Sequence, residues 1–269
     1  MARKEKVIYY KDEQNDDFAN TKIKRKALGK GFRYIHKNIF FRIFETVLYY
    51  IPAAPLVYLM QKFYSHQKFI NRKALKKVKD TGYFIYSNHT QILNDAYIGP
   101  MAAFPKKCFI ITGPDATSIK GIRTIVQALG AIPLPGNIRE SKEMLDCIDK
   151  RIEDKNVIMI YPEAHIWPYY TGIRKFPDAS FKYPTRKNVP MFVLTNCYQK
   201  RRFSKKPKIL TFVDGPFYPN KELSPTEAAK GLCEIAYNTM CRRACEHSTY
   251  EYIRYVKEEE KADSHKFSA

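Results

Sequence analysis

Six short apolar runs recur along the chain, and polar or amphipathic stretches separate them. The runs cover residues 82–87, 107–112, 130–134, 156–161, 191–196 and 209–215. Apolar runs of this length between turn signals are typical of strands that are buried on both faces of a sheet. The pattern therefore predicts a sheet whose strands are joined by elements of another kind.

Helical patterns fill the intervals between these runs. Residues 118–129 and 137–154 space their apolar side chains as amphipathic helices do. Nearer the C-terminus, Ser224 is followed by Pro225 and Glu227, a combination that caps the first turn of a long helix. Strands that alternate with helices along a chain favour parallel pairing. We therefore expect an α/β fold, with a mostly parallel sheet flanked by helices.

The most apolar segment precedes this domain and runs from Ile39 to Phe63. Its charge-free part, residues 46–60, is shorter than the ~20 residues of a typical membrane-spanning helix. Pro52 and Pro55 interrupt it near the middle, and prolines break helices. The pattern favours an apolar helical hairpin that dips into one leaflet of a membrane. A hairpin packed on a soluble core and a full transmembrane helix are the alternatives.

These patterns divide the chain into four parts. Residues 1–37 are polar and basic and predict a surface arm with some helix. Residues 38–66 form the membrane-associating hairpin, residues 67–256 form the α/β domain, and residues 257–269 form a charged, solvated tail. We see no internal repeat that would indicate a solenoid or an array.

The charge of the chain restricts its partners. There are 47 Lys and Arg residues against 27 Asp and Glu residues, a formal net charge of +20. Such a charge fits nucleic acid or an anionic membrane surface. The basic residues are dispersed, no nucleic-acid-binding motif is present, and nucleic-acid binding leaves the apolar segment unexplained. We therefore expect a membrane surface and no nucleic acid. The basic cluster 200–208 is either a solvated loop or a docking site for anionic headgroups or an acidic carrier protein.

Six cysteines occur without a signal-peptide pattern, which predicts reduced thiols in the cytosol. Cys241, Cys245 and His247 have some resemblance to a metal-binding set, but no C-x-x-C pair exists. We expect small buried residues on the inner face of the C-terminal helix, and no metal.

The stretch "YSNHTQILNDAYIG" places His89 in the turn at the end of a predicted strand. Ligands of open α/β sheets bind at the carboxyl ends of the strands, and histidine titrates near neutral pH. His89 therefore has the position of a general base, and Asp95 is near enough to orient it across an irregular turn. By itself the motif fits a polar loop residue equally well.

A second polar stretch, Tyr161-Pro162-Glu163, also follows a predicted buried strand. Glu163 is placed to point into a cleft or to lie on a solvated loop. Trp167, Tyr169 and Tyr170 follow it, and they predict an apolar wall or an aromatic surface at a membrane interface.

The order of these stretches resembles the lysophospholipid acyltransferase family, which includes the 1-acyl-glycerol-3-phosphate acyltransferases. That family carries an NH-x4-D block, a G-x-I block, an F-P-E-G-T-R block and a V-P-x-x-P block in this order. The matching positions here are Asn88, His89 and Asp95; Gly130, Ala131 and Ile132; Tyr161, Pro162 and Glu163; and Val189 and Pro190.

The resemblance implies a glycerolipid-acyltransferase-like fold and an O-acyl transfer. His89 would deprotonate the hydroxyl of a lyso-lipid acceptor, and Asp95 would stabilise the imidazolium. The alkoxide would attack the thioester of acyl-CoA or acyl-carrier protein directly, with no cofactor beyond this donor. The acceptor expected first is 1-acyl-glycerol-3-phosphate, and the expected location is the cytoplasmic face of the cell membrane. The residues expected to bind substrate are Asn88, Asn94, Gly130, Glu163, His165, Arg139, Arg174 and Lys175.

Departures from the family pattern leave alternatives open. Five residues separate His89 from Asp95 where the family has four, so Asn94 competes with Asp95 as the partner. The arginines that bind the acceptor's phosphate in the family are missing. Arg139, Arg174 or Lys175 replaces them, or the acceptor is free of phosphate, for example a glycolipid. His165 is a second base or part of a pocket wall. A basic nucleic-acid- or membrane-binding protein without catalysis is the alternative of another class.

Overall fold

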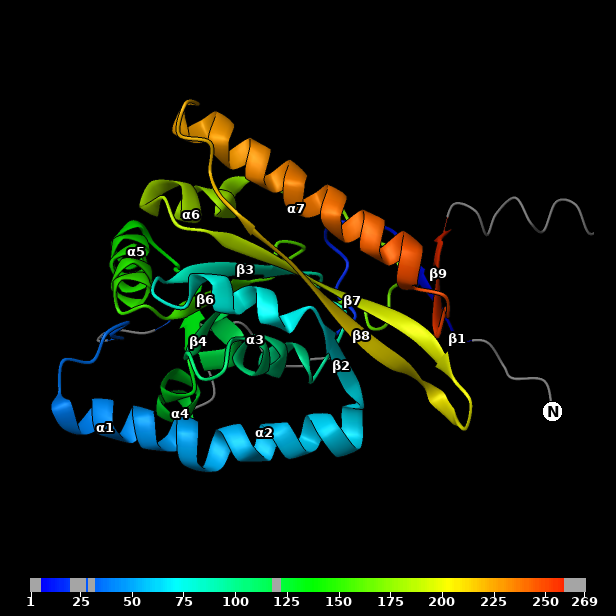
Figure 1. The fold of residues 1–269 in the computed structure, drawn as a ribbon, viewed down its shortest axis with the longest axis horizontal. Helices are drawn as coiled ribbons and strands as arrows, with labels where there is room; N and C mark the ends of the chain where they lie inside the picture. The colour runs from blue at the N-terminus through cyan, green and yellow to red at the C-terminus, as the bar shows by residue number, and fades with distance from the viewer. Residues whose placement is uncertain (1–5, 20–27, 29–31, 118–121, 259–269) are drawn as a thin grey trace, which may run out of the picture.

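A seven-stranded sheet forms the centre of the computed structural model, which describes residues 6–19, 28, 32–117 and 122–258 (Figure 1). Its strand order is β2-β8-β7-β3-β6-β4-β5. Every neighbouring pair is parallel except β7 and β8, which form an antiparallel hairpin. The strands are β2 Gln67–Ile70, β3 Tyr83–Ser87, β4 Cys108–Thr112, β5 Ala131–Pro133, β6 Val157–Ile160, β7 Met191–Arg201 and β8 Ser204–Phe217. All six predicted strands are therefore present, and the predicted α/β fold is confirmed.

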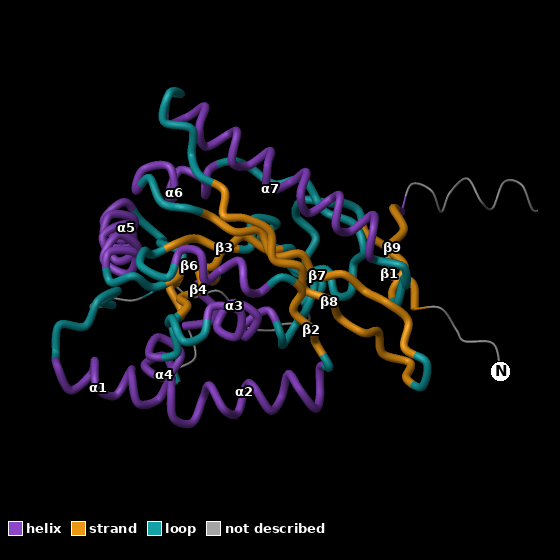
Figure 2. Tube along the Cα trace, viewed as in Figure 1, coloured by secondary structure: helices purple, strands orange, loops and turns teal. Residues whose placement is uncertain are grey.

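Helices cover both faces of this sheet, because successive side chains of a buried strand point to opposite sides. Phe84 and Tyr86 of β3 pack in one core with residues of α5 and α7, and Ile85 packs in the other with α3. Figure 2 shows the strands between these helical layers. The α-helices of the domain are α3 Asp95–Ala103, α4 Arg123–Ala128, α5 Ile138–Glu153, α6 Lys182–Lys187 and α7 Pro225–His247, and short 3-10 helices occupy Arg72–Val78, Pro114–Thr117 and Ala179–Phe181.

The C-terminal helix α7 begins as its sequence predicts. Ser224 accepts a hydrogen bond from the Glu227 backbone, and the Glu227 carboxylate accepts one from the Ser224 backbone, which completes a capping box. Its inner face differs from the expectation, because alanines, Leu232 and Met240 fill it. Cys241 is half-buried and Cys245 is exposed, so the predicted burial of these two thiols is wrong.

The apolar segment forms one long helix, and the predicted hairpin is wrong. Helix α1 (Ile39–Leu48) continues through a π-helical turn at Tyr49–Ala53 into α2 (Ala54–Met60) and a second π turn at Gln61–Ser65. Pro52 lies inside the first π turn, and Pro55 lies in the first turn of α2. Pro55 directly follows the first π turn, and a π turn absorbs a local change in the hydrogen-bond ladder. The helix therefore continues past both prolines.

This long helix lies flat against the domain, along the lower edge in Figure 1. Buried Glu45 forms an ion pair with Lys107 at 2.7 Å, and the Tyr50 hydroxyl donates to the Pro105 carbonyl at 2.8 Å. Its outer side is apolar and exposed, and only 17% of its most apolar window is buried. Residues 39–63 are long and apolar enough to cross a membrane by length and composition.

Part of the predicted basic arm belongs to a second, small sheet. Strand β1 (Lys6–Tyr10) pairs in parallel with β9 (Ile253–Lys257) near the other end of the chain. The described part of residues 1–37 therefore contains a strand where we expected some helix, and residues 20–27 and 29–31 lie outside the described residues. So do residues 259–269 of the predicted tail.

Trp167 is fully buried beside this small sheet. Its ring packs against Tyr10, Phe18 and Tyr255. It is thus a core residue, and the expectation of an aromatic surface does not hold for it.

Candidate active site

His89 and Asp95 form a direct pair at the carboxyl end of β3. The His89 Nδ1 lies 2.7 Å from Asp95 Oδ2, although the two residues are six positions apart in the chain. An irregular turn makes this possible, because it folds Asp95, the first residue of α3, back onto the imidazole. The Gln91 backbone N–H donates to the same carboxylate oxygen at 2.9 Å and fixes the turn. Asn94 instead donates its side-chain amide to Gln91 at 2.8 Å.

The surroundings of the pair hold the His89 ring in one orientation and exclude much of the water from it. Asp95 is 2% exposed, and this burial raises the pKa of its carboxyl, while the hydrogen bond from His89 opposes the rise. Because Nδ1 bonds to the carboxylate, Nε2 is the nitrogen that His89 can offer to a substrate. This is the arrangement of a base and the group that orients it.

Tyr161 contacts both members of the pair, although it was not among the expected site residues. Its ring stacks on the imidazole of His89 with centroids 4.3 Å apart and planes inclined by 20°. Its hydroxyl donates to the Asp95 backbone carbonyl at 2.5 Å. The sequence signal for this role was an aromatic residue at the end of a buried strand, directly before Pro162 and Glu163.

Glu163 links the loop that contains His89 to the loop that contains Arg174. One carboxylate oxygen accepts the His89 backbone N–H at 2.8 Å, and the other accepts the Arg174 backbone N–H at 2.9 Å. The Arg174 guanidinium lies 3.5 Å from the same carboxylate and also donates to the His165 backbone carbonyl. Burial raises the pKa of Glu163, and the charge of Arg174 opposes this rise. Both residues therefore hold the loops in place, and neither lines the cleft.

Asn88 has a similar structural role one residue before His89. Its side-chain oxygen accepts the Asn196 backbone N–H at 2.8 Å, and its amide donates to the Asn196 carbonyl at 3.1 Å. This exchange fastens the end of β3 to β7. Asn88 is buried, so its side chain supports the turn, whereas we expected it to contact substrate.

A cleft of about 720 Å³ opens in front of the pair. Three of the ten expected site residues line it: His89, Asp95 and His165. The Nδ1 of His165 lies 3.7 Å from Asp17, which favours a place in the wall. The other described lining residues are mostly apolar and include no lysine or arginine: Ile92, Ala96, Ile110, Ile111, Thr112, Gly113, Pro114, Leu134, Ile160, Tyr161, Pro162, Ala164, Ile166, Pro177, Ala179, Ser180 and Tyr183.

Three further expected residues lie away from this cleft. Arg139 is on the first turn of α5, where its side chain is 85% exposed and pairs with Glu143. Lys175 is exposed and is absent from the lining. Gly130 has φ +109°, and a Cβ atom there would lie 2.7 Å from the Cys108 carbonyl oxygen. The backbone conformation at this position requires glycine. We expected Gly130 to bind substrate, but this requirement explains why glycine is there.

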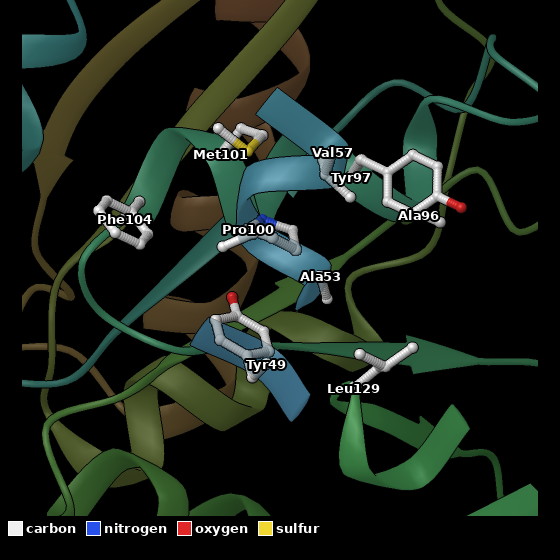
Figure 3. Close-up of a pocket in the computed structure, with 10 residues that line it drawn as sticks. Tyr49, Ala53, Val57, Ala96, Tyr97, Pro100, Met101, Phe104 and Leu129 are labelled. Atoms are coloured by element: carbon white, nitrogen blue, oxygen red, sulfur yellow. The ribbon is translucent and has the colours of Figure 1, made fainter. Parts of the chain in front are cut away.

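A smaller apolar pocket lies between the long helix and α3 (Figure 3). Ala53 and Val57 of the long helix face Pro100 and Met101 of α3 across it. Ala96, directly after Asp95, borders both this pocket and the cleft. The long helix is thus packed against α3, the helix that begins with Asp95. Among the described residues, no group of three His, Cys, Asp or Glu side chains is arranged to hold a metal ion.

Comparisons with known proteins show the family of the chain. The model of the acyltransferase family matches residues 66–250. Among solved structures, the chain resembles the 1-acyl-sn-glycerophosphate (LPA) acyltransferase PlsC from Thermotoga maritima. The two share 14% identity, the TM-score is 0.50, and the match covers 75% of this chain and 87% of that one. No curated protein matches the chain at a significant level. Because the family model covers more than half of the sequence, the chain belongs to the acyltransferase family, and its fold resembles that of PlsC.

Proposed function

We propose that this acyltransferase moves a fatty acyl group from acyl-CoA or acyl-carrier protein to the hydroxyl of a lyso-glycerolipid. The observation that carries the proposal is the 2.7 Å contact of His89 with Asp95 in the wall of a largely apolar cleft. The acceptor proposed first is 1-acyl-glycerol-3-phosphate, in phospholipid biosynthesis. The reaction uses no cofactor beyond the acyl donor.

The mechanism begins at the free nitrogen of His89. Nε2 accepts the proton of the acceptor hydroxyl, and the oxygen attacks the thioester carbonyl of the donor. The new C–O bond forms, the C–S bond breaks, and the leaving thiolate takes the proton back from the imidazolium. Asp95 holds the imidazole in the correct tautomer and stabilises its positive charge during the step. No covalent acyl-enzyme is formed.

The cleft offers room for an acyl chain beside the pair. Ile110, Ile111, Leu134 and Ile160 form much of its apolar wall. Burial of each CH₂ group of a chain contributes about 0.8 kcal/mol, so such a wall favours a fatty acyl substrate over a short polar one.

A phosphate-free acceptor is the second candidate, and one observation favours it. The described residues that line the cleft include no lysine or arginine. Arg174, the buried candidate for the missing phosphate ligand, is 1% exposed and engaged with Glu163. A phosphate in the cleft would meet few compensating charges, whereas a hydroxyl-rich headgroup needs none.

We propose further that the protein lies on the cytoplasmic face of the cell membrane without crossing it. The long helix is tied to the domain at Glu45 and again at Tyr50, so it lies along the protein. A helix held in this way presents its exposed apolar side to one leaflet, as interfacial helices do.

An acceptor panel tests the function. Radiolabelled acyl-CoA or acyl-carrier protein is incubated with 1-acyl-glycerol-3-phosphate, other lyso-phospholipids and phosphate-free lyso-glycolipids in neutral detergent. Labelled diacyl product from the phosphate acceptor supports the first candidate, and product from the glycolipid alone supports the second. If no acceptor is acylated while the chain still binds lipid, the protein is a binder without this activity.

A further inference from the structure

A second, strongly basic hollow lies at the other end of the sheet from His89. Its cations are Arg72, Lys73, Lys76, Lys79 and Lys106, and we call these five residues with their cavity the basic hollow. The cavity measures about 540 Å³. Tyr83 at the start of β3 lines it, whereas His89 follows the end of the same strand. No aspartate or glutamate is among the described residues that line it. The hollow is therefore separate from the reaction cleft, whose lining is mostly apolar.

Two of these cations are held in place by backbone carbonyls. Arg72 donates to the carbonyls of Ala102 at 3.0 Å and Phe104 at 3.1 Å. Lys106 donates to the carbonyls of Thr81 at 2.5 Å and Lys155 at 2.7 Å. Carbonyl oxygens position a cation without neutralising it.

The charge of these two cations is therefore still available to an anion. Burial lowers the pKa of both groups. The charge of Asp80 opposes this shift at Lys106, yet no ion pair joins Asp80 to Lys106 among the described residues. Arg72 is exposed and Lys106 is half-buried, so an anion that entered the hollow could reach both charges.

The remaining three lysines form a row. Lys73 and Lys76 lie on the 3-10 helix Arg72–Val78, and Lys79 directly follows it. A 3-10 helix has three residues per turn, so side chains three positions apart lie above one another. All three lysines are exposed and line the same hollow. Their ammonium groups can adjust their positions, whereas the guanidinium of Arg72 and the ammonium of Lys106 are held in place. Together these groups form a set of donors suited to a phosphate group.

The hollow adjoins the apolar helix. Phe104, which is 44% exposed, lines both the basic hollow and the apolar pocket of Figure 3. Tyr50 of the long helix contacts the Phe104 ring at 6.2 Å between centroids and bonds to the next residue, Pro105. The exposed apolar face and the basic hollow thus meet at Phe104. A ligand with an apolar body and an anionic head fits such a junction.

We propose that the basic hollow binds the phosphate headgroup of an anionic glycerophospholipid in the bilayer on which the long helix lies. Each cation near an anionic leaflet strengthens membrane attachment. Five cations in one cavity add a defined point of contact to the attraction between the basic chain and the anionic leaflet. The site anchors the domain at a second point beyond the helix. It is independent of the acyl-transfer chemistry, because none of its residues lines the reaction cleft.

The test measures how the full chain partitions onto vesicles. Vesicles of phosphatidylcholine alone are compared with vesicles that also contain phosphatidylglycerol. The variant Lys73→Ala/Lys76→Ala/Lys79→Ala should lose about tenfold or more in its partition coefficient on the anionic vesicles. On phosphatidylcholine alone, it should match the parent chain. These lysines are exposed, so the variant should fold, and its thermal unfolding and its acyl transfer in neutral detergent check this.

A matched control removes the same charge elsewhere. Lys182, Lys221 and Lys230 are exposed residues on α6, just before α7 and on α7. Figure 1 shows α6 and α7 across the sheet from the long helix. Their triple alanine variant should stay close to the parent chain on anionic vesicles. His89→Ala should also bind as the parent does, which separates this proposal from the catalytic one.

Several results would overturn the proposal. One is a hollow variant that keeps parental binding to anionic vesicles, and another is a control variant that loses as much as the hollow variant. A third comes from titration of the chain with CoA or inorganic phosphate in the absence of vesicles. If either binds the parent and the hollow variant abolishes this binding, the hollow serves a soluble ligand instead of a lipid.

Discussion

Replacing Asp95 with asparagine perturbs the candidate site at one atom pair. Asn has the shape of Asp but no charge, and its amide can donate to Nδ1 of His89, which places the imidazole proton on Nε2. That tautomer cannot accept the proton of a hydroxyl. The carboxylate is 2% exposed and 2.7 Å from the imidazole, so it stabilises the imidazolium in a partly desolvated site. Loss of one partner of a buried charge pair costs about 3–5 kcal/mol.

Each ~1.36 kcal/mol of lost transition-state stabilisation lowers the rate tenfold, so Asp95→Asn should reduce kcat by about 10²- to 10⁴-fold. The acceptor KM should change little, because the effect arises in the transition state. The assay is transfer of radiolabelled acyl groups at saturating donor and acceptor. Asn94→Ala is the matched control and should stay near the parental rate. A near-parental rate for Asp95→Asn, or a large loss for Asn94→Ala, would refute the functional pairing of His89 with Asp95.

Three further predictions concern the support of the site. Glu163→Gln leaves the buried Arg174 without its carboxylate, so the free energy of unfolding should fall by about 3–5 kcal/mol in urea titrations. Tyr161→Phe removes one hydrogen bond and keeps the stacked ring, so a stability loss of about 0.5–1.5 kcal/mol with most activity retained is expected. Burial lowers the pKa of Lys107 from 10.5 to about 8, so the folded chain releases a proton that the unfolded chain keeps. The contribution of Lys107 to stability should therefore rise as the pH rises from about 8 to 10.5. The urea midpoint of the parent chain should rise relative to that of Lys107→Met over this range. An unchanged difference would contradict this sign.

The sheet and the His89–Asp95 pair were predictable because local rules decide them. Strands such as Val157–Ile160 are buried on both faces, and this burial requires a continuous apolar run. The turn after β3 sits at a sheet edge where ligands bind, so a histidine there was a sound candidate. The extra residue before Asp95 is absorbed by the turn itself, which the Gln91 N–H closes onto the carboxylate.

Other features depend on contacts that a sequence pattern does not contain. The rule that proline breaks helices counts lost hydrogen bonds, but the π turn at Tyr49–Ala53 accommodates Pro52 and keeps the helix continuous. The pairing of β1 with β9 joins segments from opposite ends of the chain. Polarity alone did not show that Glu163 and Arg174 point inward to each other, because charged residues near a cleft usually face solvent.

The most direct test of the account is the rate of acyl transfer by His89→Ala, measured with radiolabelled donor and the acceptor that the panel identifies. We expect kcat to fall by about 10²-fold or more, as for loss of a general base, while the chain stays folded and still binds anionic vesicles. Transfer by His89→Ala at the parental rate would contradict the central claim that this histidine activates the acceptor hydroxyl.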